Sequence, residues 1–416
     1  MRYVVPYAAF TAFGVFWGTW GAALPALRDQ AGVSQGELGT ALLFVGVGAL
    51  PAMLLTGRAM DRFGSRLAAL LLIALAVAGL AVASGASSWT SLVVGMLLVG
   101  ATSGAADVAI NTVSGQVEHD SACPVLTRAH GVFSLAVVAA SLTGGLVLST
   151  LAGTGDGVGA ASALTWTFGV AAAVISLLCA FIWTGTRFNR ARPSSLAWGN
   201  ATAQESATKP KQATDSTPAA DRRSRSARLH LTPLVVVGLV GALAYGVENA
   251  HQSWGAVFLS DTFTASAQTA SLAPAAFAAA AALARLVLAP LSRTHPVPLL
   301  LTGGVLAATG SLVVATSTSV VVALVGLGVA AVGTATLFPT LLSTSLRHVR
   351  TGDRGRATSA VSTTAYLGFL LGPAYVGLLA EHVGLRGALI GVAVVAAVFT
   401  VAAVPVSRAF WRLTDE

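Results

Sequence analysis

Apolar stretches of roughly twenty residues follow one another along nearly the whole of this 416-residue chain. A helix needs about 20 apolar residues to cross the hydrocarbon core of a bilayer. Hydrophobic residues make up 55% of the sequence and charged residues only 10%, which is too few charges to cover the surface of a soluble protein. The sequence therefore predicts an all-α integral membrane protein.

The apolar runs and the polar breaks between them predict about twelve transmembrane helices. Their predicted ranges are 4–24, 36–56, 67–86, 89–115, 130–152, 160–184, 232–258, 266–291, 297–316, 318–345, 357–380 and 384–406.

A long polar stretch divides these helices into two groups of six. Residues 185–231 are rich in Ser, Thr, Ala, Lys and Arg and contain almost nothing to bury, so we expect a disordered cytoplasmic linker. The predicted domains are an N-terminal bundle over 1–184 and a C-terminal bundle over 232–406, followed by a cytoplasmic tail over 407–416.

The two groups also show weak internal similarity. At a constant offset of 228, one helix of each group shares an Arg-Ala pair, a serine and a glycine, namely Arg128-Ala129, Ser134 and Gly144 with Arg356-Ala357, Ser362 and Gly372. A weaker match relates Trp20-Gly21-Ala22 to Trp254-Gly255-Ala256. Both matches favour two pseudo-symmetric bundles.

The formal charge of +8 comes from arginines and lysines in the connections between apolar segments. Nearly all arginines in short connections fall on one side, and the other side has only Arg28 and Arg386, so the positive-inside rule predicts that both termini are cytoplasmic. We expect a multi-pass protein of a bacterial inner membrane and no nucleic-acid partner. Cys123 and Cys179 lie far apart without neighbouring Cys or His, so no metal or other cofactor is expected.

The connection after 36–56 carries a recognisable motif, with Gly57, Asp61-Arg62, Gly64 and Arg66 in sequence. Its spacing of glycine, three residues, Asp-Arg, one residue and glycine resembles the signature of the major facilitator superfamily. The two glycines suggest a tight turn. The resemblance implies two six-helix halves and a cytoplasmic gate formed by these five residues. Ser65 departs from the family pattern, and the second copy near Arg293 lacks the acid.

Ionisable residues are rare in membrane helices because each costs on the order of 3 kcal/mol at the bilayer centre. Asp107 lies in the predicted helix 89–115 and Glu248 in the predicted helix 232–258. A carboxyl group in a central cavity can carry a proton without exposing a bare charge to lipid. We therefore predict Asp107 and Glu248 as proton-coupling residues, with the proton gradient as the driving force.

Further polar and aromatic residues share these helices or the first one. The substrate-binding candidates are Asn111, Tyr245, Asn249, His251, Gln252, Trp17 and Trp20. An alternative interpretation is that the polar side chains only bond to neighbouring helices and that the tryptophans only pack.

Three local patterns resemble the fucose/proton symporter-like branch of the superfamily and its uncharacterised bacterial relatives. These are Ala129 to Ser134 (Ala-His-Gly-Val-Phe-Ser), Glu248-x5-Trp254-Gly255 and Tyr366-x-Gly368-x3-Gly372-Pro373. The resemblance implies a monomeric secondary transporter that moves a small solute, such as a sugar or related polar metabolite, by alternating access with protons.

Two other functions stay open at this level. One is proton-antiport efflux of a drug or secondary metabolite, although Ser141 stands where the corresponding antiporter motif has a proline. The other is a membrane sensor that transports nothing. The sequence contains no paired nucleophile and base and no nucleotide-binding loop, so we do not expect an enzyme.

Overall fold

The structure is a computed structural model that describes residues 4–121, 123, 125–153, 159–187, 231–288, 290–347, 349 and 353–415. The first six helices are α1 (Val4–Ala31), α2 (Gln35–Phe63), α3 (Arg66–Gly85), α4 (Trp89–Ser121), α5 (Val125–Gly153) and α6 (Ala160–Arg187). Most of the predicted linker, 185–231, lies outside the described residues.

The second group begins with α7 (Leu231–Phe263) and contains several interrupted helices. Its other members are α8 (Ala267–Ala270), α9 (Leu272–Leu288), α10 (Leu291–Thr294), α11 (Pro296–Thr316), α12 (Val320–Thr334), α13 (Leu337–Leu346) and α14 (Arg354–Asp415). Gly384 interrupts α14 with a φ of 71°, a left-handed conformation that favours glycine.

The described chain contains ten helical stretches long and apolar enough to span a membrane. Two of them join consecutive helices, α8 with α9 and α12 with α13. The longest, Arg356–Val406, is divided at Gly384 into two passages, and the 28-residue α1 supplies a further one. The prediction of twelve transmembrane helices is confirmed.

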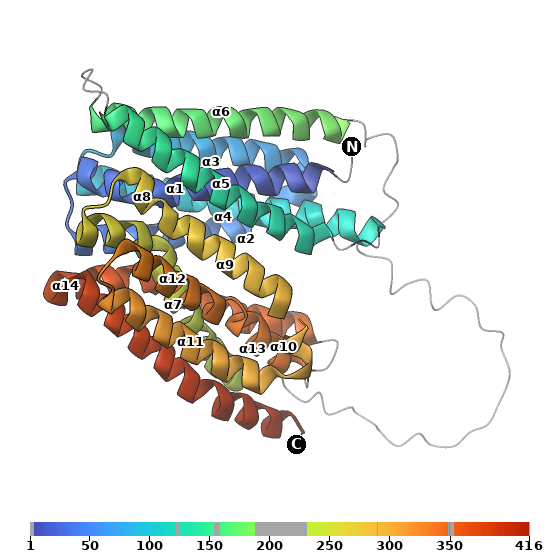
Figure 1. Cartoon of the computed structure of the whole chain (residues 1–416). Coiled ribbons are helices and arrows are strands. Elements are labelled where there is room, and N and C mark those ends of the chain that lie inside the picture. Colours follow the sequence, from blue (N-terminus) through green and yellow to red (C-terminus); the bar gives the residue numbers. More distant parts are fainter. Residues whose placement is uncertain are drawn as a thin grey trace, which may run out of the picture.

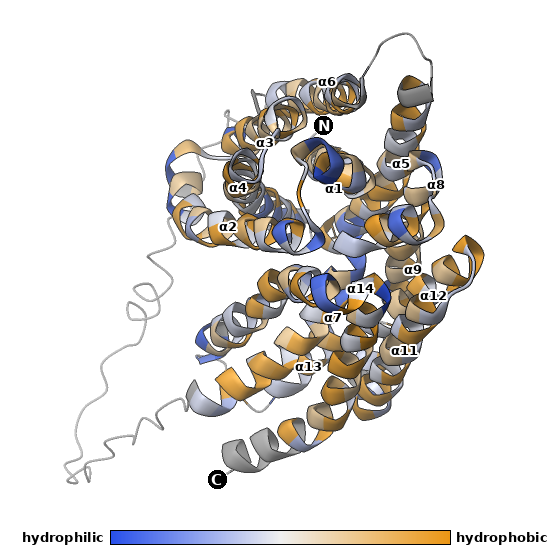
Figure 2. Cartoon of the chain, turned by 90° about the vertical axis from the view of Figure 1, so that its left-hand side faces the viewer, coloured by the Kyte–Doolittle hydropathy of each residue, from blue (hydrophilic) through white to orange (hydrophobic). Residues whose placement is uncertain are grey.

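The helices fall into two groups, with α1 to α6 on one side and α7 to α14 on the other (Figure 1). The chain enters α1 and leaves α14 at the same end of the molecule. Many large apolar side chains stay exposed, including Leu54 at 75% and Val401 at 77%. Seen from the end where α1 connects to α2, hydrophobic residues cover the outer faces of the helices (Figure 2). This surface suits lipid.

The motif at the end of α2 differs from the predicted turn at one of its glycines. Gly57 lies inside α2, which continues to Phe63 instead of ending near residue 56, since an isolated glycine destabilises a helix by only about 1 kcal/mol. The turn is made at Gly64, whose φ is 67°. Arg62 lies over the Phe63 ring at 5.5 Å, and Arg66 over the Trp183 ring at 5.1 Å. The gate role of Gly57, Asp61, Arg62, Gly64 and Arg66 stays a prediction.

Close packing between helices repeats in the two groups at the predicted offset. A Cβ atom on Gly14 of α1 would lie 2.5 Å from the Phe133 carbonyl oxygen of α5, and one on Gly238 of α7 would lie 2.9 Å from the Val361 carbonyl oxygen of α14. Phe133 and Val361 are 228 positions apart, whereas Gly14 and Gly238 are 224 apart. Contacts between α1 and α5 therefore correspond to contacts between α7 and α14.

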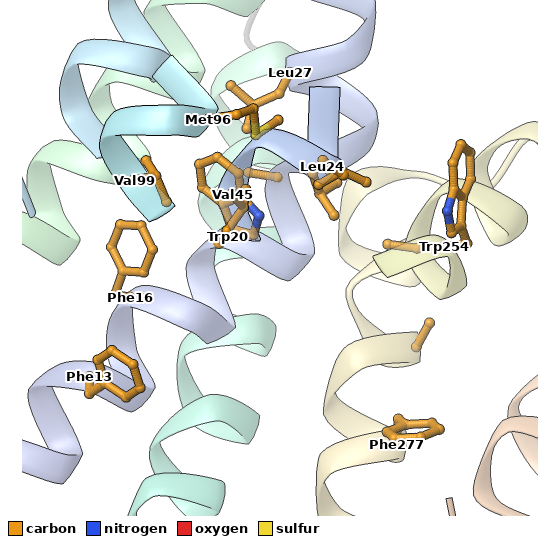
Figure 3. Close-up of a cluster of buried hydrophobic side chains, with 14 of the residues drawn as sticks. Phe13, Phe16, Trp20, Leu24, Leu27, Val45, Met96, Val99, Trp254 and Phe277 are labelled. Carbon is orange, nitrogen blue, oxygen red and sulfur yellow. The ribbon is translucent and has the colours of Figure 1, made fainter. Parts of the chain in front are cut away.

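The weaker repeat does not follow this register. Trp20 and Trp254 are 234 positions apart, so they occupy different levels of α1 and α7. Figure 3 shows Trp20 on α1 and Trp254 well to one side of it on α7. The Trp254 indole donates to the Pro373 carbonyl oxygen at 3.0 Å. Three-residue matches in sequences rich in Gly and Ala arise easily, and this one is not a structural equivalence.

Candidate functional site

A cavity of about 340 Å³ lies between the two groups of helices. Seven helices contribute residues to its wall. They are α1, α2, α4 and α5 from the first group, and α7, α9 and the first passage of α14 from the second. Its volume falls within the range of small-molecule sites, roughly 300–1,000 Å³. Its ionisable wall residues, among those the structure describes, are Asp107, Glu248, Arg285 and Tyr366.

Asp107 reaches this cavity from α4, near the middle of a 33-residue helix. The Asn111 side-chain amide, one turn further on, donates to Asp107 Oδ1 at 3.0 Å and to the Asp107 carbonyl oxygen at 2.8 Å. The spacing of four residues puts both side chains on one face of the helix. Asn111 thus orients the predicted proton site and is not itself among the wall residues.

Glu248 reaches the same cavity from α7, in the other group of helices. The Gln252 side-chain amide donates to Glu248 Oε1 at 3.2 Å. Arg285 Nη2 of α9 lies 2.6 Å from the same carboxylate oxygen and forms an ion pair with it. Only 12% of the Glu248 side chain is exposed, so the acid is held mainly by protein groups.

Arg285 is the site residue that the sequence analysis missed. Its Nε donates to the carbonyl oxygen of Ala335 at 3.2 Å, at the break between α12 and α13. Interrupted helices in transporters leave carbonyl groups free for such contacts. The cost argument that selected Asp107 and Glu248 applies equally to an arginine inside the predicted helix 266–291, and it would have found this one.

Asn249 and Gln252, two of the predicted substrate-binding candidates, line the cavity beside Glu248. Asn249 also spans two helices, because its amide donates to the Phe369 carbonyl oxygen of α14 at 2.5 Å. Tyr245 lies beside the cavity, with its ring packed on Phe338 at 4.4 Å between centroids and on Tyr366 at 6.2 Å. Tyr366, rather than Tyr245, belongs to the wall.

His251 lies apart from the other candidates, on the opposite side of α7 and only 2% exposed. Its ring shares hydrogen bonds with the Val247 carbonyl oxygen at 2.8 Å and the Ser311 hydroxyl at 3.2 Å. It also stacks on Phe277 at 6.0 Å. The structure therefore separates His251 from the cavity by the side chain of Phe277, which is itself a wall residue.

Trp17 and Trp20 both line the cavity from α1, together with Phe13. Trp20 stacks on Phe16 at 5.8 Å, and Trp17 meets Trp20 edge to face at 6.4 Å. Trp20 is only 3% exposed, so packing takes most of its surface and Trp17 offers more to a ligand. Among the described residues, no group of three His, Cys, Asp or Glu side chains could hold a metal ion.

The two groups of helices are held together at the end where α1 connects to α2. Arg28 of α1 forms an ion pair with Asp261 of α7, and Glu381 of α14 accepts a hydrogen bond from the Gly36 amide of α2 at 3.2 Å. Gly39 of α2 and Gly377 of α14 meet so closely that a Cβ on Gly39 would lie 2.8 Å from the other Cα. These contacts close one end of the interface that contains the cavity.

Curated relatives are transporters or membrane proteins. The chain is 32% identical over 136 residues to an uncharacterised transporter of Sinorhizobium fredii and 30% identical over 158 residues to an uncharacterised MFS-type transporter of Yersinia pestis. These matches span 35% and 37% of the relatives' lengths and 32% and 38% of this chain. Membrane protein MosC of Rhizobium meliloti is 24% identical over 406 residues, covering 97% of this chain and 90% of that protein.

Solved transporter structures share the fold. A bacterial homologue of the human lysosomal transporter Spinster superposes with a TM-score of 0.69 at 15% identity, covering 98% of this chain and 96% of that one. A D-xylose-proton symporter gives 0.68 at 15% identity, with 96% of each chain covered. FucP in its outward conformation gives 0.55 at 17% identity, over 98% and 99% of the two chains.

The family model of the Major Facilitator Superfamily matches residues 7–250 and 234–412, which together span nearly the whole sequence. The helices, the motif around Gly64 and the cavity between two groups of helices agree with that match. The chain belongs to the Major Facilitator Superfamily.

Proposed function

We propose that this protein is a secondary active transporter that couples the movement of a small solute to protons through Asp107 and Glu248. The observation that carries the proposal is that these two acids come from opposite groups of helices and line one cavity. In this fold the two halves rock about a site between them, so both acids would face the solute in either state.

Protonation gives these acids a means of coupling. A carboxylate at membrane depth can take up a proton, and the neutral form can pass between states without carrying a bare charge. One solved structure with this fold is that of a D-xylose-proton symporter, a protein named for the coupling of sugar to protons. A sugar or a related polar metabolite is the corresponding solute class here.

The orientation is part of the same proposal. Arginines dominate the connections at the end where α1 begins, and the positive-inside rule assigns that end to the cytoplasm. The end closed by Arg28 and Asp261 would then face the outside, with both termini in the cytoplasm of a bacterium. The six membrane passages on each side of the 185–231 segment would be the two moving bodies.

The test is proton movement in proteoliposomes that contain the full chain and an internal pH indicator. Members of a panel of sugars, polyols, sugar acids and amino sugars are added outside, and solute-dependent acidification or alkalinisation of the lumen is recorded. We expect an active solute to move protons with the unmodified protein and not with Asp107→Asn or Glu248→Gln. Asp120→Asn is the matched control, because Asp120 is an exposed acid at the end of α4. Unchanged proton movement in both cavity variants would contradict the assignment.

Export by proton antiport is the second candidate function. The aromatic side chains of Phe13, Trp17, Phe133 and Phe277 give the cavity an apolar wall that would suit a drug or secondary metabolite. Deleting the gene separates the two functions. Hypersensitivity to a toxic compound supports export, whereas loss of growth on a solute supports uptake.

A further inference from the structure

Arg285 supplies the fixed positive charge of the cavity wall among the described residues. Its side chain is 47% exposed, whereas that of its partner Glu248 is 12% exposed. The cation, rather than the acid, thus presents the larger free surface.

The hydrogen bonds of Arg285 leave part of its guanidinium group available. Nη2 contacts a single oxygen of Glu248, and Nε contacts the Ala335 carbonyl oxygen. A guanidinium has five N–H donors arranged as a fork that matches both oxygens of a carboxylate. The pair with Glu248 uses one nitrogen and one oxygen. A bidentate contact, in which two guanidinium nitrogens donate to both oxygens of another carboxylate, would use more of the donors.

The charges of the wall link such a contact to a proton. Two acids, Asp107 and Glu248, share the cavity with one arginine. A negatively charged solute would be repelled while both acids are ionised. Protonation of Glu248 removes one negative charge and releases Arg285, so proton binding and anion binding each strengthen the other.

We propose that Arg285 is the specificity-determining residue of the cavity and that the solute carries a carboxylate. In this proposal, which rests on the proposed proton-coupled transport, the solute carboxylate takes the position of Glu248 on the guanidinium when Glu248 binds a proton. The only bond that changes is the O–H bond of Glu248, which forms when the acid takes a proton from water and breaks when the proton leaves as the solute departs. A cationic solute would be repelled by Arg285. A neutral solute would form no ion pair with Arg285 when protonation of Glu248 releases it.

Other titratable groups lie within electrostatic range of the ion pair or of Asp107. They are His130 on α5, Tyr245 on α7 and Tyr366 on α14. Of these, His130 is the residue type whose ordinary pKa lies nearest to neutral pH, so its part in any pH dependence is tested separately. The His130→Gln variant is therefore part of the experiment.

The experiment compares two matched series of probes with the purified full-length protein, using thermal stabilisation to measure binding. The first series is D-gluconate, D-glucitol and 1-amino-1-deoxy-D-glucitol, which differ only in carrying an anionic, neutral or cationic group at one end. The second is benzoate, benzyl alcohol and benzylamine, which offer a ring to the aromatic wall. Each is measured at about pH 5.5 and about pH 8, because a carboxyl group binds more protons at the lower pH.

We expect the anion of at least one series to bind about tenfold more tightly than its neutral and cationic counterparts, since bonds to a charged group are the strong ones. Arg285→Gln should abolish that preference, and Arg285→Lys should retain part of it. Arg386→Gln, the matched control, should leave it intact, because Arg386 lies outside the cavity and donates to the Ala315 carbonyl oxygen. Glu248→Gln should raise the affinity for the anion at about pH 8 and reduce the dependence of that affinity on pH, and His130→Gln should not.

Three results would overturn the proposal. They are a preference for the neutral or cationic probe in both series, an anion preference that survives Arg285→Gln, and no stabilisation by any probe in either the unmodified protein or Glu248→Gln. The failure of proton coupling is a separate outcome. If anion binding depends on Arg285 while solute entry into proteoliposomes ignores a pH gradient, the substrate class holds and the coupling does not.

Discussion

The guanidinium of Arg28 on α1 binds both carboxylate oxygens of Asp261 on α7, at 2.5 and 2.8 Å. The Gln35 side-chain amide of α2 donates to the same carboxylate at 3.0 Å. The two charged side chains are only 14% and 21% exposed, so solvent screens their attraction less than that of a surface pair. This contact joins the two groups of helices and holds one end of their interface closed.

Asp261→Asn should therefore open that end more often. The amide keeps the shape of the side chain but loses the charge-assisted pair, which contributes roughly 1 kcal/mol at a partly exposed site and thus about a fivefold change in population. The measurement is the labelling rate of Ser253→Cys, a cavity-wall position, by a membrane-impermeant maleimide. The reference is the same cysteine variant with Asp261 intact.

Asp29→Asn provides the control for this effect. Asp29 also contacts Arg28, at 2.9 Å, but it lies on α1 with it and is 64% exposed. Loss of the Asp29 charge should leave the labelling rate within about twofold of the rate for Ser253→Cys alone, as expected for an exposed ion pair. Equal acceleration by both variants would mean that Arg28 itself, rather than its link to α7, controls the opening.

Glu381→Ala should weaken the same closed end through a different contact. The Glu381 carboxylate accepts hydrogen bonds from the Ser34 hydroxyl and from the Gly36 amide at the start of α2, where the helix dipole favours a negative charge. We expect Glu381→Ala to raise the Ser253→Cys labelling rate and Glu381→Gln to have a smaller effect. Glu37→Ala is the control. The Glu37 carboxylate accepts a hydrogen bond from the Ser34 amide at 2.8 Å, so it caps the same helix end from within the first group of helices.

Gly368→Val should destabilise the packing of α7 on α14. A Cβ at Gly368 would overlap the Ala242 carbonyl oxygen, and both partners are backbone atoms in helices that cannot move aside easily. Overpacking of this kind costs roughly 1–3 kcal/mol. The measurement is the thermal unfolding temperature of the purified protein. Gly169→Val, on α6 with open space around it, should show a much smaller decrease.

His251→Ala should lower stability without a specific loss of solute affinity. The variant removes the hydrogen bonds to Val247 and Ser311 and the stacking on Phe277, and it leaves a cavity that we expect to cost roughly 2–4 kcal/mol. Trp17→Ala, on the cavity wall, should have the opposite profile. Thermal unfolding with and without a bound probe measures both quantities. A selective loss of binding in His251→Ala would restore the substrate role predicted from its sequence position.

Local sequence was enough to predict the helices, because membrane spans need long apolar runs and those runs are visible in the sequence. It also indicated the superfamily, because the spacing of Gly57, Asp61-Arg62 and Gly64 resembles the family signature, and Gly64 makes the turn with a positive φ. Asp107 and Glu248 were found for a similar reason, since a carboxylate inside an apolar helix is too costly to be accidental.

Contacts between distant segments decided the rest. Periodicity along α7 puts Tyr245, Glu248, Asn249, His251 and Gln252 close together, yet only the packing of α9, α11 and α14 determines which of them face the cavity. The Arg285 contact with Glu248 joins residues 37 positions apart, and the Arg28 contact with Asp261 joins residues 233 apart. Apolar length fixed how many helices cross the membrane, and the packing of those helices fixed which charges meet.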